Sequence, residues 1–220
     1  MIERPSPNHD ARPGAVDMLI LHYTGMRSGA AALDRMCDQQ AKVSAHYCID
    51  TDGTVYRLVA EERRAWHAGV SFWGGRRRVN DRSIGIELVN PGHEYGYVPF
   101  TPAQIHALIA LCRDVLSRHA IPARHVLGHS DVAPERKTDP GELFPWAELA
   151  ENGIGLWPQP REPVTDFAAA LAGFGYGVPP LVEVPLDAVV TAFQRHFRPS
   201  CIDGVADAQC AAILAGLIGR

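Results

Sequence analysis

The chain has 220 residues, of which 46% are hydrophobic, so it can form one full globular domain with a core and a small second unit. Its 21 basic and 25 acidic residues leave no basic excess, which argues against nucleic acid or an anionic membrane as the main partner. No apolar run approaches the ~20 residues of a membrane-spanning helix. Residues 1–17 contain no apolar stretch typical of a secretory signal, so we expect a cytoplasmic protein. Five cysteines without a CxxC pair favour reduced thiols over a disulfide or a cysteine metal site.

The N-terminal half of the chain predicts three strands and one helix after a polar, proline-rich lead-in over residues 1–17. We expect a buried strand within 16–25, a helix over 29–41, and strands within 44–50 and 55–59 joined as a tight hairpin. Residues 60–82 follow no regular period and are predicted to be irregular.

A clear strand follows over residues 83–90. Its alternation places Ile84, Ile86 and Leu88 on one face and Glu87 on the other. Thr101 and Pro102 then suit the first positions of a helix over 101–120. A short strand over 125–129 leads into residues 128–141, which have no helical or strand period and are expected to form a loop that packs against almost nothing.

Proline-rich residues 156–164 predict a linker between a first domain, residues 1–155, and a small helical unit, residues 165–220. Three apolar-periodic segments within that unit each suit a helix. Because some 55 residues are few for an independent core, we expect the unit to lean on the first domain.

Polar residues with catalytic chemistry occur at the ends of several predicted strands. His22 ends a buried strand, Glu87 lies in another, and His129, Lys137 and Asp139 follow a third. Neighbouring strand ends meet at one edge of a sheet, so these groups can share a cleft. Two histidines and a carboxylate suit a catalytic zinc with an open position for water. A second carboxylate could accept the proton of that water and a lysine could stabilise an oxyanion, which together describe amide hydrolysis.

Each of these residues also has a structural interpretation when it is taken alone. His22 could be a core histidine bonded to backbone, and Glu87 could face the surface of its sheet. His129 and Asp139 could order their loop by hydrogen bonds, and no HxxH or HExxH spacing is present.

Five motifs in order make the chain similar to the zinc-dependent N-acetylmuramoyl-L-alanine amidases, whose fold is shared by T7-type lysozyme and the peptidoglycan recognition proteins. The motifs, within about residues 10–150, are LILHYTG (19–25), SAHYCIDTDGTVYRLV (44–59), AWHAGVSFW (65–73), NDRSIGIELVN (80–90) and GHSDVAPERKTDPG (128–141). The resemblance implies an α/β fold with a mixed central β-sheet flanked by helices. It further implies Zn²⁺ as the cofactor, with His22, His129 and Asp139 as its ligands. Glu87 matches the catalytic glutamate and Lys137 the lysine that stabilises the transition state.

The same resemblance suggests substrate contacts, with structural alternatives left open. Trp66, His67 and Ala68 match a segment that lines the groove, and Tyr47 and Asn90 lie near the catalytic motifs. Trp66 and Tyr47 could equally be core or wall aromatics. The arginines at 76–78 could be a solvated loop or could meet the carboxylates of a stem peptide.

The tail resembles a small three-helix peptidoglycan-binding module through AFQRHF and IDGVADAQCAAIL. Cys210 stands where that pattern usually has threonine, so the unit could bind glycan or serve as a structural wing beside the groove.

We therefore predict a zinc amidase that separates N-acetylmuramic acid from the L-alanine of the stem peptide, with motifs closest to the branch acting on 1,6-anhydromuramyl peptides in peptidoglycan recycling. Muropeptides are the expected partners of a monomer that needs neither nucleic acid nor membrane. The alternatives are a peptidoglycan-binding protein without catalysis, a zinc hydrolase of another amide, and a periplasmic wall-remodelling amidase.

Overall fold

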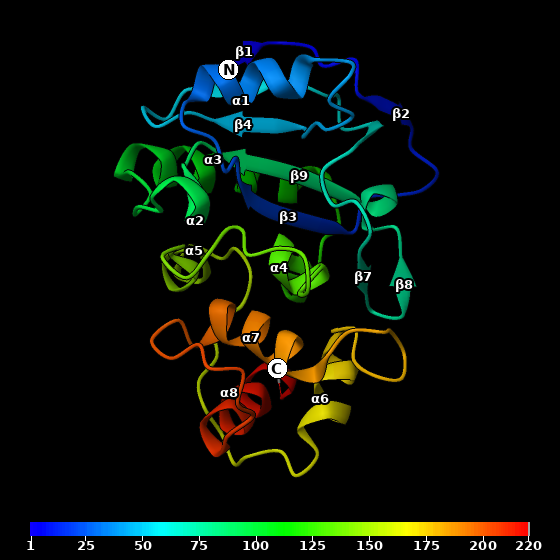
Figure 1. Ribbon diagram of the computed structural model, residues 1–220, viewed down its shortest axis with the longest axis vertical. Helices are drawn as coiled ribbons and strands as arrows, with labels where there is room; N and C mark the ends of the chain where they lie inside the picture. Colours follow the sequence, from blue (N-terminus) through cyan, green and yellow to red (C-terminus); the bar gives the residue numbers. More distant parts are fainter. Residues whose placement is uncertain (220) are drawn as a thin grey trace.

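The computed structural model describes residues 1–219, and Figure 1 shows its central sheet with helices on both sides and a helical unit below. The strands are β1 (Ile2–Glu3), β2 (His9–Ala11), β3 (Met18–Tyr23), β4 (Tyr47–Ile49), β5 (Val55–Arg57), β6 (Arg63–Ala65), β7 (Phe72–Trp73), β8 (Arg76–Arg77), β9 (Ser83–Leu88) and β10 (Val126–Gly128). The α-helices are α1 (Gly29–Cys37), α2 (Gly92–Tyr95), α3 (Pro102–Arg118), α4 (His129–Val132), α5 (Trp146–Glu151), α6 (Phe167–Phe174), α7 (Leu186–Phe197) and α8 (Ala208–Ile218). Two short 3₁₀ helices are η1 (Val79–Arg82) and η2 (Ala123–His125).

The main sheet has six strands in the order β1-β5-β4-β9-β3-β10. The β4–β5 pair is antiparallel, as the predicted hairpin requires, and the other pairs are parallel. This mixed sheet with flanking helices confirms the predicted fold class. Two small antiparallel pairs, β2–β6 and β7–β8, lie outside the main sheet.

The alternation of β3 decides which of its residues face the functional side of the sheet. Leu19 and Leu21 pack into the apolar cluster that includes α3, whereas Met18 and Ile20 pack into the cluster shared with the C-terminal helices. His22 continues the Met18–Ile20 series, since successive side chains of a strand point to opposite faces. In the register of β3 with β9, His22 pairs with Glu87, so both reach the same edge of the sheet.

The longest helix, α3, begins where its sequence predicts. The Thr101 hydroxyl accepts a hydrogen bond from the Gln104 backbone, the Gln104 side chain accepts one from the Thr101 backbone, and Pro102 stands at the first helical position. Its apolar stripe covers the face of the sheet opposite His22, which leaves the His22 face free for the site.

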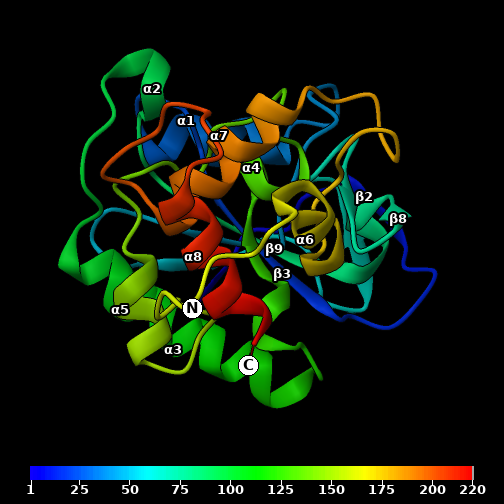
Figure 2. The same cartoon turned by 90° about the horizontal axis from the view of Figure 1, so that it is seen from below.

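The three C-terminal helices do not form a core of their own. Leu171, Val189 and Phe193 share one apolar cluster with Ile20 of β3 and Leu127 of β10. Figures 1 and 2 show α4 between the sheet and these helices, and α7 packs against α4. The unit therefore leans on the first domain, as its small size requires.

The predicted linker, residues 156–164, is not a free tether. The Arg161 and Val164 amides donate hydrogen bonds to Ala212 and Ala211 of α8, and Leu156 and Val164 pack against the shared cluster. The proposed boundaries at residues 155 and 165 stay a prediction.

Two sequence expectations about irregular segments were wrong. Residues 60–82 contain β6, β7, β8 and η1, while β1 and β2 lie in the extended lead-in. These strands have two or three residues each, too few for a period to show in the sequence. The loop expected to pack against nothing begins with α4, whose four residues are all buried. The polar composition of this segment suggested exposure to solvent. Its burial depends on hydrogen-bond partners that lie far along the chain.

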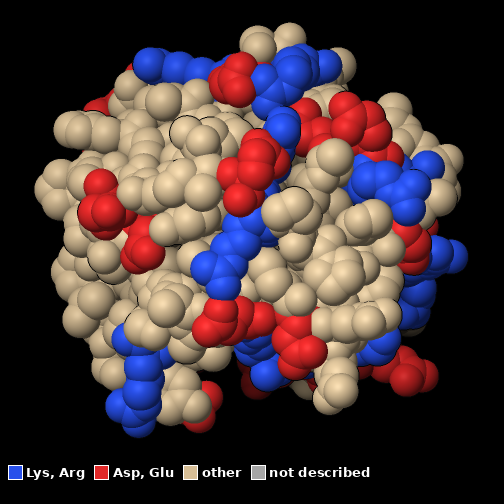
Figure 3. All heavy atoms as spheres, turned by 90° about the horizontal axis from the view of Figure 1, so that it is seen from above, with Lys and Arg blue, Asp and Glu red and all other residues tan. Residues whose placement is uncertain are grey.

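The surface mixes charges of both signs. On the face seen in Figure 3, Lys and Arg side chains are interspersed with Asp and Glu. Ion pairs such as Arg4 with Asp34 and Arg57 with Glu3 join the two kinds. Among residues 1–219, none of the helices has the length and apolar character needed to cross a bilayer.

Candidate metal centre and active site

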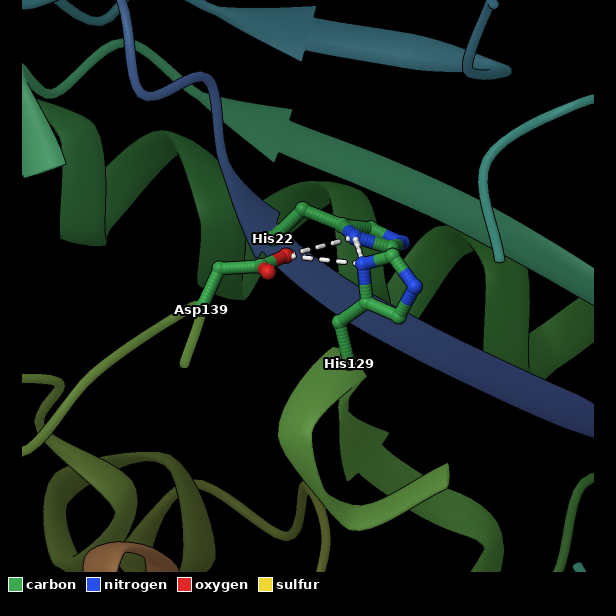
Figure 4. A group of neighbouring side chains, drawn as sticks. All are labelled: His22, His129 and Asp139. Carbon is green, nitrogen blue, oxygen red and sulfur yellow. Dashed lines mark hydrogen bonds and ion pairs between the residues drawn. The ribbon is translucent and has the colours of Figure 1, made fainter. Parts of the chain in front are cut away.

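Two histidines and an aspartate from three separate segments converge beneath the edge of the sheet. His22 comes from the end of β3, His129 begins α4 and Asp139 lies in the loop beyond it (Figure 4). The Nδ1 atoms of His22 and His129 are 3.0 Å apart, and Asp139 Oδ2 lies 2.9 Å from the first and 3.1 Å from the second. The three residues are buried, with at most 6% of any one exposed.

The Nε2 atom of each histidine, on the side of the ring away from the three converging atoms, has a hydrogen-bond partner of its own. These bonds hold each ring with Nδ1 toward the other donors. His22 Nε2 lies 3.0 Å from His67 Nδ1, and His129 Nε2 lies 3.1 Å from the Ala68 carbonyl oxygen. The Ala68 carbonyl can only accept, so His129 Nε2 carries a proton and its Nδ1 offers a lone pair. The same tautomer of His22 lets its Nε2–H donate to His67.

A hydrogen-bond chain continues behind His67 and fixes its orientation. His67 Nε2 lies 3.2 Å from the Ser83 hydroxyl, which donates to the Val79 carbonyl at 2.8 Å. Because the Ser83 hydroxyl donates its proton to the Val79 carbonyl, it can only accept from His67. His67 Nε2–H therefore donates to Ser83, and His67 Nδ1 accepts from His22. Metal-binding histidines are generally held by such a partner on the outer nitrogen.

The charge states of His22 and Asp139 suit metal binding. Burial, followed by the nearby His129, lowers the pKa of His22 to about 4, so its imidazole is neutral at pH 7. Burial would raise the pKa of Asp139, but the two histidines lower it well below its usual range, so it is an anion. Metal ligation needs neutral imidazole and ionised carboxylate.

The donor set therefore fits a divalent cation. The three donor atoms lie within 4.8 Å of one another. Two nitrogens and one oxygen leave a fourth tetrahedral position for water or substrate, as in catalytic rather than structural zinc sites. In the described part of the chain, no other group of three His, Cys, Asp or Glu side chains converges in this way.

A cleft of about 790 Å³ opens onto this centre. One wall consists of the sheet and of residues 129–139, called here the metal loop. It contributes Glu87, His129, Lys137 and Asp139. Residues of α1 and of the segment before it, including Arg27 and Arg35, form another wall. The structure thus brings together all five residues that the sequence proposed for metal binding and catalysis, with His22 buried just below the cleft.

Glu87 is a partly buried residue with a buried carboxyl oxygen. Its Oε2 atom has no hydrogen-bond partner among residues 1–219. Burial, followed by the charge of Asp139, raises the pKa of Glu87 well above its usual range, while Lys137 acts in the opposite direction. A raised pKa makes the ionised carboxylate a stronger proton acceptor, so a carboxyl of this kind beside a site for water is suited to accept and return a proton.

The five predicted substrate contacts divide into two groups. Trp66 and His67 line the cleft, although His67 also serves as the partner of His22. Tyr47, Ala68 and Asn90 are not among the residues that line it, and their role as substrate contacts stays a prediction.

The reasons lie in how each of the three side chains is held. Tyr47 faces the α3 side of the sheet and its hydroxyl donates to Glu61 at 2.7 Å. Ala68 is fully buried, and its carbonyl oxygen accepts hydrogen bonds from His129 and Arg136. Asn90 orders its own loop, accepting from the Gly92 amide and donating to the Val98 carbonyl.

Three supporting residues were missed from the sequence. Arg136 donates to the carbonyls of Ala68 and Val70 at 2.9 and 2.6 Å, which ties the 68–70 segment to the metal loop. Ser83 completes the chain behind His67, and Asp131 is buried in α4. Arg136 could have been noted from its place in the RKTDPG motif, but the other two carry no local signal.

Comparison with known proteins agrees with this arrangement. A sequence model of the N-acetylmuramoyl-L-alanine amidase family matches residues 12–142. N-acetylmuramoyl-L-alanine amidase AmiD of Escherichia coli (strain K12) is 40% identical over 232 aligned residues, which cover 93% of this chain and 83% of that protein. The 1,6-anhydro-N-acetylmuramyl-L-alanine amidase AmpD of the same organism is 38% identical over 164 residues, 66% of this chain and 87% of the relative.

A solved structure extends the likeness over almost the whole fold. AmiD from E. coli, in complex with the substrate anhydro-N-acetylmuramic acid-L-Ala-D-γ-Glu-L-Lys, superposes with a TM-score of 0.84 at 39% identity. The match covers 96% of this chain and 92% of that chain, so it includes the C-terminal helices.

The mixed sheet and its buried His-His-Asp centre, flanked by a carboxyl and an amine, define a site for the hydrolysis of an amide. The chain belongs to the N-acetylmuramoyl-L-alanine amidase family. The enzyme class predicted from the sequence is thereby confirmed, and the protein is an N-acetylmuramoyl-L-alanine amidase.

Proposed function

We propose that this amidase uses zinc and acts on 1,6-anhydromuramyl peptides, the soluble fragments released as peptidoglycan is turned over. The observation that carries the proposal is the convergence of the His22 and His129 Nδ1 atoms and Asp139 Oδ2 in a site that also holds Glu87, whose Oε2 atom has no hydrogen-bond partner among residues 1–219. The substrate class is supported by the anhydro-sugar named for AmpD and by the peptide bound to AmiD, both of which are similar to this chain.

The ligands of the zinc would be His22, His129 and Asp139. Zinc held there polarises a carbonyl and lowers the pKa of a bound water to roughly 7. His67 and the Ala68 carbonyl hold the two imidazoles in the tautomer that this requires.

Glu87 and Lys137 carry the remaining steps. Glu87 accepts a proton from the attacking water as the new bond forms at the lactyl carbonyl carbon. The oxyanion that develops there is stabilised by the Lys137 ammonium, which lines the same cleft. Glu87 then passes its proton to the nitrogen of L-alanine as the carbon–nitrogen bond breaks, which releases a free peptide and anhydromuramic acid.

The test is to incubate purified protein with a soluble 1,6-anhydromuramyl tripeptide and, separately, with the same peptide on an ordinary reducing muramyl sugar. Mass spectrometry then follows release of free peptide with and without a chelator. Faster release from the anhydro substrate, abolished by chelation and restored by zinc, is expected. Equal release from both sugars would contradict the substrate preference. Release that withstands chelation would contradict the role of zinc.

A cytoplasmic location and a monomeric state stay predictions of the sequence analysis. Assaying intact peptidoglycan sacculi beside the soluble peptides addresses the location, because an enzyme of recycling is expected to act on the fragments and to leave the sacculi intact.

A further inference from the structure

Asp131 is a buried carboxylate next to the metal centre that the proposed chemistry does not use. It lies in α4, two residues beyond His129, and is 1% exposed. Among residues 1–219, neither a lysine nor an arginine forms an ion pair with it. Its oxygens instead accept three hydrogen bonds, from the Gly128 amide at 2.8 Å, the Tyr176 hydroxyl at 2.6 Å and His196 Nδ1 at 2.7 Å.

The first of these bonds shapes the turn that carries the ligands. The bond from the Gly128 amide to Asp131 Oδ2 closes the first turn of α4, inside which His129 stands. The amide of Ser130, the residue after His129, donates to the carbonyl oxygen of Asp139 at 2.9 Å. One turn of backbone therefore presents one ligand and anchors the main chain of another.

The other two donors come from the C-terminal helical unit and are rigidly confined. Tyr176 follows α6, is fully buried and packs edge-on against Trp73 with ring centres 4.8 Å apart. His196 of α7 lies between the rings of Trp146 and Phe197, at 3.7 and 3.8 Å. Because neither donor can follow a moving carboxylate, the two together define where Asp131 sits.

We propose that Tyr176 and His196 are positioning residues for the metal centre, acting through Asp131 on the α4 turn that presents His129 and holds Asp139. The C-terminal unit is on this account part of the scaffold of the metal site. The inference rests on the proposed zinc-dependent function, and it concerns how tightly the protein holds the ion.

A physical argument gives the expected size of the effect. Removing one donor leaves a buried carboxylate short of a hydrogen-bond partner, which costs free energy. The turn can reduce that cost only by shifting Asp131, which shifts His129 with it. Changes to residues that orient metal ligands weaken metal affinity about 10- to 100-fold. We expect about ten-fold here, the lower end of that range, since the influence passes through one turn of backbone.

The test uses two substitutions in the full chain that remove a donor and keep an aromatic ring. Tyr176→Phe deletes only the hydroxyl, and His196→Phe keeps a flat ring between Trp146 and Phe197. The matched control is Gln194→Met. Gln194 is a fully buried residue of α7 whose amide bonds only to residues of the C-terminal unit, including Asp203 and Val205. The control loosens that unit without touching Asp131.

Zinc affinity is measured on metal-free protein by competition with a chromophoric chelator, and hydrolysis is measured at low and at saturating zinc. Both Phe variants are expected to bind zinc about ten-fold more weakly than wild type, with an unchanged KM and with kcat largely restored by excess zinc. Gln194→Met is expected to melt at a lower temperature and to keep wild-type zinc affinity.

Three results would overturn the inference. Folded Tyr176→Phe and His196→Phe proteins with wild-type zinc affinity would exclude a positioning role. A control that loses as much affinity as they do would assign the effect to general loosening of the C-terminal unit. A wild-type protein that binds no zinc would refute the proposed function and this inference with it, whereas the first two results leave that function intact.

Discussion

The Nε2 atom of His22 lies 3.0 Å from the Nδ1 atom of His67, with both rings buried and set edge to face. This contact makes His67 a partner of a metal ligand as well as a residue of the cleft wall. Burial and the neighbouring histidines lower the pKa of His67 well below its usual range, so it accepts from His22 as a neutral ring. A role in holding the metal is therefore expected alongside any contact with substrate.

His67→Phe should weaken zinc binding about 10- to 100-fold, because His22 loses the acceptor that fixes its tautomer. A residue that only contacted substrate would raise KM and leave zinc affinity alone. The matched control is Trp66→Phe, since Trp66 lines the same cleft and is not one of the three converging donors. Chelator competition and steady-state kinetics on both variants distinguish the two roles. Unchanged zinc affinity in His67→Phe would refute the positioning role.

Gly85→Ala should disturb the same contact from the opposite side. A methyl group at this position would lie 2.5 Å from Cγ of His67, too close for the ring to stay where it is. We expect a loss of zinc affinity comparable to that of His67→Phe. Gly173→Ala is the control, because within residues 1–219 no atom beyond its chain neighbours and its own helix backbone lies within 4 Å of the added methyl group. That helical substitution should be neutral or stabilise by up to about 1 kcal/mol. Wild-type zinc affinity in Gly85→Ala would show that His67 can move without consequence.

Glu87→Gln should lower kcat by about 10²- to 10⁴-fold, because the amide keeps the shape of the side chain and cannot accept a proton. Zinc content should not change, since Glu87 is not among the three converging donors. Measuring metal content and turnover on the same preparation separates the two effects. A Glu87→Gln protein with near wild-type turnover would remove Glu87 from the mechanism.

The predicted role of Tyr47 as a substrate contact can be tested directly. Because its ring packs on the α3 side of the sheet and its hydroxyl bonds to Glu61, Tyr47→Phe should leave KM unchanged. The free energy of unfolding should fall by about 1.5–3 kcal/mol, the value of a hydrogen bond to a charged group. A raised KM with unchanged stability would restore Tyr47 as a substrate contact.

The lowered pKa of Glu61 leads us to expect a pH dependence of stability that is separate from catalysis. Burial would raise its pKa, but hydrogen bonds from Arg118, Tyr47 and His119 lower the pKa from its usual 4.5 to about 2. A folded-state pKa below the unfolded value stabilises the fold above pH 4.5, and that contribution is lost as the pH falls toward 2.

Glu61→Gln should therefore be less stable than wild type at pH 7, and the difference should shrink between pH 4.5 and 2. Denaturant unfolding of both proteins across this range measures it. A stability difference that stays constant as the pH falls would contradict the assignment.

The sequence predicted the parts of the site that depend on strand alternation and on ordered motifs. The period of two in β9 placed Glu87 opposite Ile84, Ile86 and Leu88, and the structure agrees. What it could not predict depends on distant partners. In the sequence, Asp131 looks like an ordinary loop residue. Its hydrogen-bond partners Tyr176 and His196 are 45 and 65 positions away along the chain.

Tyr47 is a second residue whose surroundings the sequence could not predict. Its place in a motif suggested a role in the cleft, but adjacent residues of a strand point to opposite faces of the sheet. In the register of β4 with β9, Tyr47 pairs with Ile86 while Cys48 pairs with Glu87. Only that register decides which of the two faces the site.

The most direct test of the central claim is a titration of metal-free enzyme with zinc while release of free peptide from an anhydromuramyl substrate is followed. Hydrolysis should be absent at the start, rise in proportion to added zinc and level off at one ion per chain, as expected from the single His22–His129–Asp139 centre in the described residues. Full activity before any zinc is added would contradict the account, and so would binding of one zinc without release of peptide.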